Sequence, residues 1–572
     1  MSARRSSRVR GPPSKFTDET NGFEEMSGEE MSDAERGHIQ WYRGRTHGDV
    51  TGDVGRDRSR SPHQRWRTEA EPDDGVPQSL TFNPKRAPGV QPPLNMGSPS
   101  PGEIFSHFFS AAVFKLLCEN TNKNAAKNLE RGKKFDWSEV TPGEMQKFVG
   151  MLLYMSVLDL PRMSDFWRRE SIFHVAFPAT VMVRNRFMSI LSNLQMSDPE
   201  ECEENDKKKG SEDYDQFHLV RPLMEMICMN CKSIYHPRQH LAVDERMVRT
   251  KARFGIKQYL KGKPTKWGLK FFVLADVNGY IIDFILYKPN RASGKGLSFD
   301  IVATLVDKDS LGSGYIIYTN NFFTNPILFR HLRQQGFGAC GTYRQGRDGT
   351  PTTQENALTK TSPRGSIRWI RDRELLFVKW MDVREVSLCS TVHSVFSGDI
   401  VDHYVSGDGA EQKISLLRPT SVTEYNKYMG GVDTSDQMIG THSVPRKTMR
   451  WTVTIFQHLV DIAATNSFII HTDRCDSMQQ NPMTRQRFQE QLTAHLLGVK
   501  LKNVPQIPPG QKHLPVPTRS EHTEAHKAGQ GRRRCRLCHR STAWMCEACD
   551  VGLCLQPDRN CFWQHHQGHS LQ

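Results

Sequence analysis

Acidic side chains in two well-separated segments could together bind divalent metal ions. The segment QHLAVDE is an alternating run that predicts a strand delivering Asp244 to its carboxyl end, with Glu245 behind it. The segment YNKYMGGVDTSDQM places a glycine pair before a predicted helix start, with Asp433 and Asp436 one turn apart. Carboxylate oxygens are the ligands that Mg²⁺ prefers. Each segment also has a purely structural interpretation, since acids in a first helical turn stabilise the helix dipole.

A third segment, GYIIYTNNFFTN, lies between these two and is predicted to be a short apolar strand that ends at Asn320. The segment contains no acidic residue. An amide suits a strand end or a turn, which explains why a fold tolerates Asn320 there. As a metal ligand, its carbonyl oxygen is neutral and weaker than a carboxylate.

The strongest local motif is a cluster of cysteines near the C-terminal end. Six of the thirteen cysteines lie between Cys535 and Cys561, as CRLC, CEAC and two single residues, and histidines follow. Two CxxC pairs with further Cys and His in an intracellular chain indicate zinc rather than disulfides, and metal binding would drive folding of so small a segment. Seven or eight ligands predict two tetrahedral sites, and interleaved sites that share alternate pairs are one arrangement. The best ligands by spacing are Cys535, Cys538, Cys546, Cys549, Cys554, Cys561 and His566, and the eighth is either His565 or His569.

Clustered cations indicate contacts with phosphate. The segment HSVPRKTMRWTVTIFQHLV is predicted to be a helix with Ser443 and Pro445 at its entrance. Cations in its first turns oppose the helix dipole, a conflict that a bound phosphate would relieve; solvated surface charge is the alternative. The candidate DNA-binding residues are Arg446, Lys447 and Arg450 in this helix and Arg532, Arg533 and Arg534 before the cysteine cluster, with Lys261, Lys263 and Lys266 as weaker candidates.

The order and content of these segments resemble the piggyBac family of DNA transposases. Further blocks similar to the family, in the family's order, are RPLMEMICMNCKSIYHPRQHLAVDE, KGKPTKWGLKFFVLADVNGY, ACGTYRQGR and VPRKTMRWTVTIFQHLVDIAATNSFII. The resemblance covers roughly residues 101–572. It implies that Asp244 and Asp433 match the first and third catalytic aspartates, and that Asp436 matches an accompanying acid. Asn320 stands where the second catalytic aspartate belongs.

This departure falls on the chemistry that the family implies. Two-metal cleavage of a phosphodiester needs two cations about 3.5 to 4 Å apart, held by anionic oxygens. Replacing one carboxylate by the amide of Asn320 removes a full negative charge from the ligand cluster. We therefore expect magnesium occupancy and cleavage rate to fall by orders of magnitude.

Three functions follow from these residues and this resemblance. The first is a domesticated, transposase-derived nuclear protein that binds double-stranded DNA but cuts poorly or not at all. The second is an active cut-and-paste transposase that inserts at TTAA sites. The third is an interaction scaffold whose zinc module binds a protein partner. The resemblance also implies a cross-brace zinc domain with two structural zinc ions, a catalytic magnesium site that is weak or lost, and a homodimer.

Composition agrees with a nucleic-acid partner. The net charge is 77 − 63 = +14 and the pI is about 9.2. No uninterrupted apolar run has the length of a membrane span, and the N-terminus lacks the apolar segment of a signal peptide, so no membrane partner is expected.

The fold class is α/β. Three strands, a helix, a strand and further helices from residue 241 onward fit the RNase H-like catalytic core that the resemblance implies. Helical dimerisation and DNA-binding regions are expected on both sides of this core, with a β-rich insertion inside it. The predicted regions are 1–100 disordered, 101–239 helical, 240–348 catalytic, 349–418 insertion, 419–441 catalytic, 442–505 helical, 506–530 linker and 531–572 zinc-binding.

Overall fold

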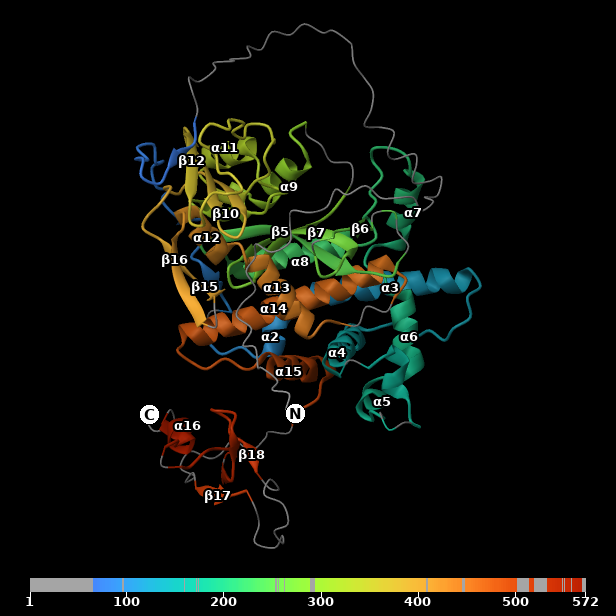
Figure 1. Ribbon diagram of the computed structural model, residues 1–572. Coiled ribbons are helices and arrows are strands. Elements are labelled where there is room, and N and C mark those ends of the chain that lie inside the picture. The colour runs from blue at the N-terminus through green and yellow to red at the C-terminus, as the bar shows by residue number, and fades with distance from the viewer. Residues whose placement is uncertain are drawn as a thin grey trace, which may run out of the picture. The chain divides into compact units, whose positions relative to one another are not determined.

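The computed structural model describes two units, 1–499 and 500–572, and each is considered by itself (Figure 1). The described residues are 65–567, except for 95–96, 159, 171, 173, 253–254, 256, 262, 289–293, 408–409, 445–447, 502–513, 519–531, 548, 550 and 557.

The first unit is built on a ten-stranded sheet in the order β1-β12-β13-β14-β11-β10-β5-β7-β6, with β8 also paired to β7. Its strands are β1 (Arg67–Thr68), β5 (His240–Arg249), β6 (Gln258–Tyr259), β7 (Trp267–Asp276), β8 (Ile281–Leu286), β10 (Ile316–Thr319), β11 (Gly338–Thr342), β12 (Ile367–Asp372), β13 (Leu375–Met381) and β14 (Glu385–Ser390).

The middle of the sheet has the order β8-β7-β5-β10-β11. The first three strands are antiparallel, whereas β10 runs parallel to both β5 and β11. β7 and β8 form a hairpin, and Gly279 in its turn has a φ of +89°. Because β10 and β11 are parallel, they need a crossover, which α11 (Pro326–Gln334) supplies. The predicted mixed α/β order is therefore present.

Of the strands in residues 349–418, three belong to this same sheet and two form a separate hairpin. β14 pairs with β11, so β12, β13 and β14 continue the central sheet. A further hairpin is made by β15 (Ile400–Gly407) and β16 (Ala410–Leu417).

Helices between the strands of this sheet and after it in sequence make up most of the rest of the first unit. They are α2 (Pro101–Ser106), α3 (Ala111–Glu130), α4 (Pro142–Leu158), η2 (Met163–Trp167), α5 (Phe177–Val181), α6 (Arg184–Asn193), α7 (Pro199–Lys207), α8 (Arg221–Ile234), α9 (Leu297–Leu305), α10 (Lys308–Leu311), α12 (Thr420–Tyr428), α13 (Gly431–Thr441), α14 (Trp451–Ser477) and α15 (Arg485–Leu497). The start of the predicted helical region 101–239 forms two helices, α2 and α3, because the Ser110 side chain caps a new helix by accepting from the Val113 N–H.

Helix α14 is long and apolar enough to cross a bilayer by length and composition, but 94% of its most apolar window is buried inside the protein. It packs against α2, α8 and α13. We therefore describe it as the core helix of the helical region.

The prediction of disorder for residues 1–100 is wrong from residue 65 onward. Trp66 is only 1% exposed, and its indole N–H donates to the Thr353 carbonyl oxygen. Strand β1 pairs with β12, while β2 (Asn83–Pro84) and β3 (Gly89–Val90) pair with β9 (Gly312–Ser313) and β4 (Tyr235–His236). In residues 65–100 a few apolar side chains pack against elements that are distant in sequence. The average composition of the segment does not reveal such contacts. Residues 1–64 lie outside the described residues.

The second unit is a small fold around the cysteines. It contains β17 (Pro515–Pro517), β18 (Arg533–Arg534), β19 (Ser541–Thr542), β20 (Trp544–Cys546), β21 (Val551–Gly552) and α16 (Cys561–Gln567). Strand β17, in the predicted linker 506–530, pairs with β20, so the unit's fold includes residues before 531.

Candidate functional site

The sheet brings Asp244 and Asn320 together. β5 does not end at Asp244 as predicted but continues to Arg249, so the aspartate lies in the middle of the strand. β10 ends at Thr319, which pairs with Val243 on β5, so Asn320 follows level with Asp244. The site therefore lies where β10 ends and its parallel pairing with β5 stops, and not at the end of β5.

Helix α13 adds the other two predicted acids. Its first residue, Gly431, packs so closely on the end of β7 that an added Cβ would lie 2.5 Å from the Asp276 carbonyl oxygen. This approach places Asp433, in the first turn of α13, 3.7 Å from the Lys263 ammonium. Asp436 accepts a hydrogen bond from Arg246 Nε on β5 at 2.5 Å. We call Asp244, Glu245, Asp433 and Asp436 the acidic centre.

Asn320 is turned so that its amide nitrogen faces the acids. Its Oδ1 accepts from the backbone N–H of Phe322 at 2.8 Å, and because that N–H can only donate, the atom facing it is the oxygen. Its Nδ2 then donates to Asp244 Oδ1 and to Glu245 Oε2, each at 2.7 Å. The amide therefore contributes two donors to the acidic centre and no acceptor.

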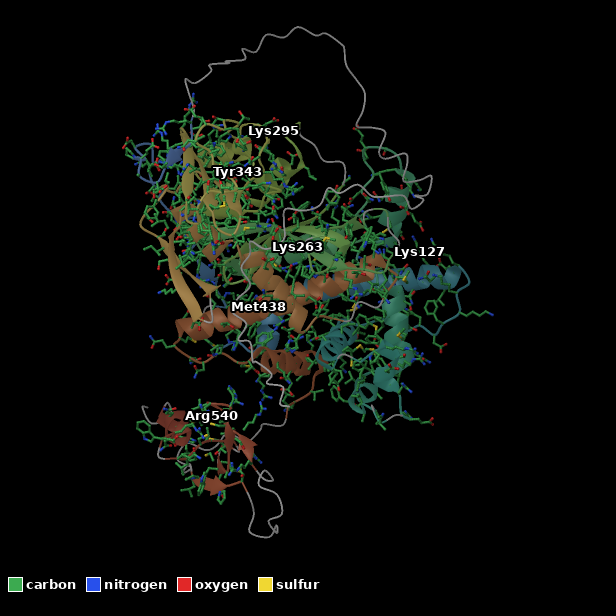
Figure 2. All side chains as sticks on the ribbon, viewed as in Figure 1. Lys127, Lys263, Lys295, Tyr343, Met438 and Arg540 are labelled. Carbon is green, nitrogen blue, oxygen red and sulfur yellow. The ribbon has the colours of Figure 1, made fainter. Side chains whose placement is uncertain are left out.

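Cations of the protein itself neutralise most of the acidic centre. Lys263 Nζ lies 2.9 Å from Asp244 Oδ2 (Lys263 is labelled in Figure 2), and Lys270 Nζ lies 3.3 Å from Glu245 Oε1. Lys270 is also held over the ring of Phe322, at 4.5 Å from the centroid. With Arg246 on Asp436, three cations face four carboxylates.

The pKa values follow from this arrangement. Burial alone raises the pKa of the Asp244 carboxyl, but the charge of Lys263 and hydrogen bonds outweigh it and hold the pKa below its usual value. Burial lowers the pKa of Lys263, but the charges of Asp244 and Asp433 outweigh it and raise the pKa. Burial and the charge of Asp244 raise the pKa of Glu245 to about 7.

We expect the raised pKa of Glu245 to weaken the fold as pH increases. Its folded pKa of about 7 exceeds the ordinary value of 4.5, so folding favours the protonated acid. Stability from this group is fully present below pH 4.5 and is lost as pH rises through about 7. The loss is on the order of 3 kcal/mol. Glu245→Gln, which stays neutral, should flatten the decline of the unfolding free energy, measured by urea unfolding across this pH range.

Glu225→Gln is the matched control, because the Glu225 side chain on α8 is 63% exposed. It should keep the pH dependence of the wild type. An unchanged slope in Glu245→Gln would show that Glu245 is not the titrating group.

These residues do not fit a two-magnesium site. Such a site needs anionic oxygens aimed at both metals. Here Asn320 aims its N–H groups at the acids and uses its oxygen on the backbone, and Lys263 lies between Asp244 and Asp433. No catalytic step through magnesium is therefore derived for this chain.

The predicted DNA-binding helix begins later than expected. α14 starts at Trp451, so Arg450 is its N-cap residue and not part of its first turns. Its guanidinium donates to the carbonyl oxygens of Leu191, Ser192 and Leu194 at 3.0, 2.6 and 2.8 Å, at the C-terminal end of α6. Arg450 thus ties two helices together, and its DNA contact stays a prediction. Arg446 and Lys447 lie outside the described residues.

The cysteines of the second unit form two groups. Within each group, the ligand atoms lie within 4.8 Å of one another. A tetrahedron of sulfur atoms about 2.3 Å from zinc has edges of about 3.8 Å, and the Cys538 and Cys554 sulfurs lie 3.6 Å apart. The two groups fit two metal sites that are interleaved in sequence: the first and third pairs of ligands form one group, and the second pair joins the histidine in the other. They are Cys535, Cys538, Cys554 and Cys561, and Cys546, Cys549 and His566.

His566 is oriented as a ligand. Its Nδ1 lies 2.6 Å from the Phe562 carbonyl oxygen, which leaves Nε2 facing the Cys549 sulfur at 3.6 Å. The eighth ligand stays open, because His569 lies outside the described residues and His565 is not in either group. Arg532, Arg533 and Arg534 are exposed just before Cys535, the first cysteine of this unit.

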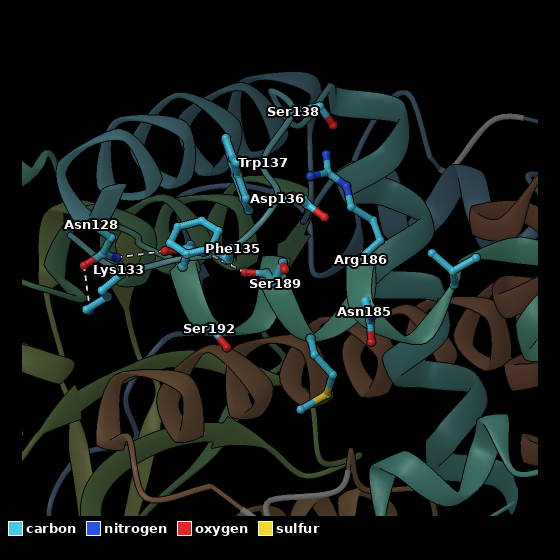
Figure 3. Close-up of a pocket in the computed structure, with 13 residues that line it drawn as sticks. Asn128, Lys133, Phe135, Asp136, Trp137, Ser138, Asn185, Arg186, Ser189 and Ser192 are labelled. Atoms are coloured by element: carbon cyan, nitrogen blue, oxygen red, sulfur yellow. Dashed lines mark hydrogen bonds between the residues drawn. The ribbon is translucent and has the colours of Figure 1, made fainter. Parts of the chain in front are cut away.

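A separate pocket of about 780 Å³ lies in the helical region (Figure 3). Its walls come from α3, residues 133–138 and α6, and include Phe135 and Trp137. The Arg186 guanidinium packs 5.0 Å from the Trp137 ring and pairs with Glu144. The pocket shares no residue with the acidic centre.

The chain is similar to transposases and to proteins derived from them. A model of the family described as "Transposase IS4" matches residues 100–468. The human (Homo sapiens) piggyBac transposable element-derived protein 3 is 27% identical over 468 residues, which cover 79% of this chain and 74% of that protein. The human piggyBac transposable element-derived protein 2 is 27% identical over 402 residues, covering 68% of this chain and 64% of that protein.

The fold has a solved counterpart. The piggyBac transposase in a synaptic complex with hairpin DNA aligns with a TM-score of 0.61 at 23% identity, over 82% of this chain and 98% of that one. The family model covers more than half of the 572 residues, and both relatives carry the same family name. The chain belongs to the piggyBac family of transposases.

Proposed function

We propose that this chain is a transposase-derived nuclear protein that binds double-stranded DNA and has an impaired site for cutting it. The carrying observation is Asn320, whose amide donates to Asp244 and Glu245 where the family resemblance calls for a metal-binding aspartate. The protein's own cations then hold the acids that a metal would need. Cutting is lost through this one position, while the surrounding fold is kept.

The strand order around the acidic centre supports an RNase H-like origin for this core. Three antiparallel strands followed by two parallel ones carry Asp244 on β5 and Asn320 after β10. The acids of α13 complete the arrangement, although α13 follows the strands of residues 349–418 in sequence. The helical regions before and after this core are where we place the contacts of a homodimer.

Binding to DNA is supported by charge and by the second unit. The chain carries a net charge of +14, and exposed arginines directly precede the first cysteine of the second unit. We assign the two cysteine groups to structural zinc, in a cross-brace module whose arginine side faces phosphates. The solved piggyBac transposase, which is in a synaptic complex with hairpin DNA, supports the same class of ligand.

The test is DNA binding and DNA cleavage by the full chain. We expect affinity for duplex DNA that falls steeply with salt, and no cleavage with Mg²⁺. Replacing Arg532 and Arg534 by alanine should reduce the slope of log K against log [salt] by about 2, since each phosphate contact contributes about one.

Lys207→Ala is the control for charge alone, because Lys207 belongs to the acidic helix α7 and pairs with Glu204. It should leave the slope unchanged. Robust cleavage by the unmodified chain would overturn the loss of cutting, and salt-independent or absent DNA binding would overturn the binding function.

A further inference from the structure

We propose that the β6–β7 hairpin contacts DNA at unpaired bases, which stack on Tyr259 and Trp267. This inference rests on the proposed DNA-binding function and adds to it a preferred form of DNA. Its ligand is a strand with bases free to leave the stack, such as a bulge or a single-stranded segment.

The two rings form an exposed pair at the edge of the sheet. β6 is the last strand in the sheet order, and Tyr259 lies directly opposite Trp267 on β7. Their ring centroids are 4.9 Å apart at an interplanar angle of 48°. Tyr259 is 48% exposed and Trp267 is 55% exposed. A cross-strand pair that served only the hairpin would hide more of its ring surface, so much aromatic surface here is left for a ligand.

The charge around the pair is that of a site for a polyanion. Besides Lys263, which pairs with Asp244 and Asp433, the nineteen residues 249–267 include six lysines and arginines and no acid. Lys257 holds its ammonium 5.7 Å from the centre of the Trp267 ring. A protein ligand with apolar side chains would not require this charge, whereas phosphates of a nucleic acid would.

The loop of the same hairpin reaches the acidic centre. Between the two ring-bearing strands, Lys263 turns inward and contacts Asp244 and Asp433. A strand of DNA whose bases lie on Tyr259 and Trp267 would therefore pass close to the acidic centre. In uniform duplex the base faces are covered by neighbouring bases, so the ring faces can be used only where bases are unpaired.

The experiment compares two probes with the full chain: a uniform duplex, and the same duplex carrying four unpaired thymines. We expect the wild type to bind the probe with unpaired bases about tenfold more tightly. Trp267→Thr and Tyr259→Thr keep a residue suited to a strand and should each remove most of this preference, with the affinity for uniform duplex unchanged. Trp267→Phe and Tyr259→Phe retain a ring and should keep it.

The outcomes separate this proposal from the proposed function. Equal affinity of the wild type for both probes overturns the stacking proposal and leaves DNA binding standing. Equal loss of affinity for both probes in the threonine variants, with unchanged circular dichroism melting, assigns the hairpin to phosphate contact and also overturns stacking. No binding to either probe overturns the proposed function itself. Val383→Thr, at a position 82% exposed beside β13, is the surface control and should behave as wild type.

Discussion

Asn320→Asp is expected to lower the stability of the metal-free protein and to make that stability depend on Mg²⁺ or Mn²⁺. The amide of Asn320 now donates to Asp244 and Glu245 at 2.7 Å each. A carboxylate there has no proton to donate, so both hydrogen bonds are lost and an anionic oxygen faces the Asp244 carboxylate. We expect a cost of about 3 kcal/mol.

A divalent cation should reverse this loss. With aspartate at 320, Asp244 and Asp433 would regain a third anionic ligand, and a cation that binds only the folded state stabilises it by mass action. Lys263 has to leave the acids for this to happen, and its flexible stem allows the ammonium to move. The wild type, which already neutralises Asp244 with Lys263, should show no such dependence.

Thermal melting with and without metal measures this effect, and isothermal titration measures the binding itself. Asn321→Asp is the matched control, since it makes the same change one residue away, where the side chain accepts from Arg344 at 3.3 Å. It should melt like the wild type in both conditions. Equal metal affinity of the wild type and Asn320→Asp would contradict our account of the site.

The sequence predicted the parts of the site that have a local signal. The alternating run before Asp244, the apolar strand before Asn320 and the glycine pair before Asp433 each match an element of the structure. The cysteine spacing likewise predicted two sites, and the two groups of the structure have the interleaved arrangement, which was one of the alternatives. Strand ends were less predictable. β5 extends past Asp244 because it pairs with β7, and the alternation of apolar and polar residues in β5 does not indicate this extension.

The cations of the acidic centre were missed. The sequence makes Lys263 a weaker candidate for DNA contact, but the structure turns it toward Asp244 and Asp433. Lys270 did leave a signal, since a lysine inside the apolar strand WGLKFFVLAD must be buried and therefore needs a partner. That the partner is Glu245 depends on the pairing of β5 with β7, which the sequence does not specify.

Removal of zinc is expected to unfold the second unit and to leave the first unit folded. Four of the five residues in the buried cluster of the second unit are cysteines, and the fifth is Leu553. So little apolar surface cannot stabilise the unit, whereas structural zinc contributes about 10 to 16 kcal/mol. The full chain should contain two zinc ions. A chelator should abolish hydrogen-exchange protection after residue 514 and reduce DNA affinity, while the sheet of the first unit stays protected.

Single substitutions separate the two sites. Cys535→Ser should remove one zinc ion and Cys546→Ser the other, because the structure places them in different groups. Cys202→Ser, on α7 and outside both groups, controls for the loss of a thiol and should keep two zinc ions. If Cys535→Ser and Cys549→Ser removed the same ion, the shared-pair arrangement would be wrong. If the unit stayed folded after chelation, its stability would have to come from contacts other than metal.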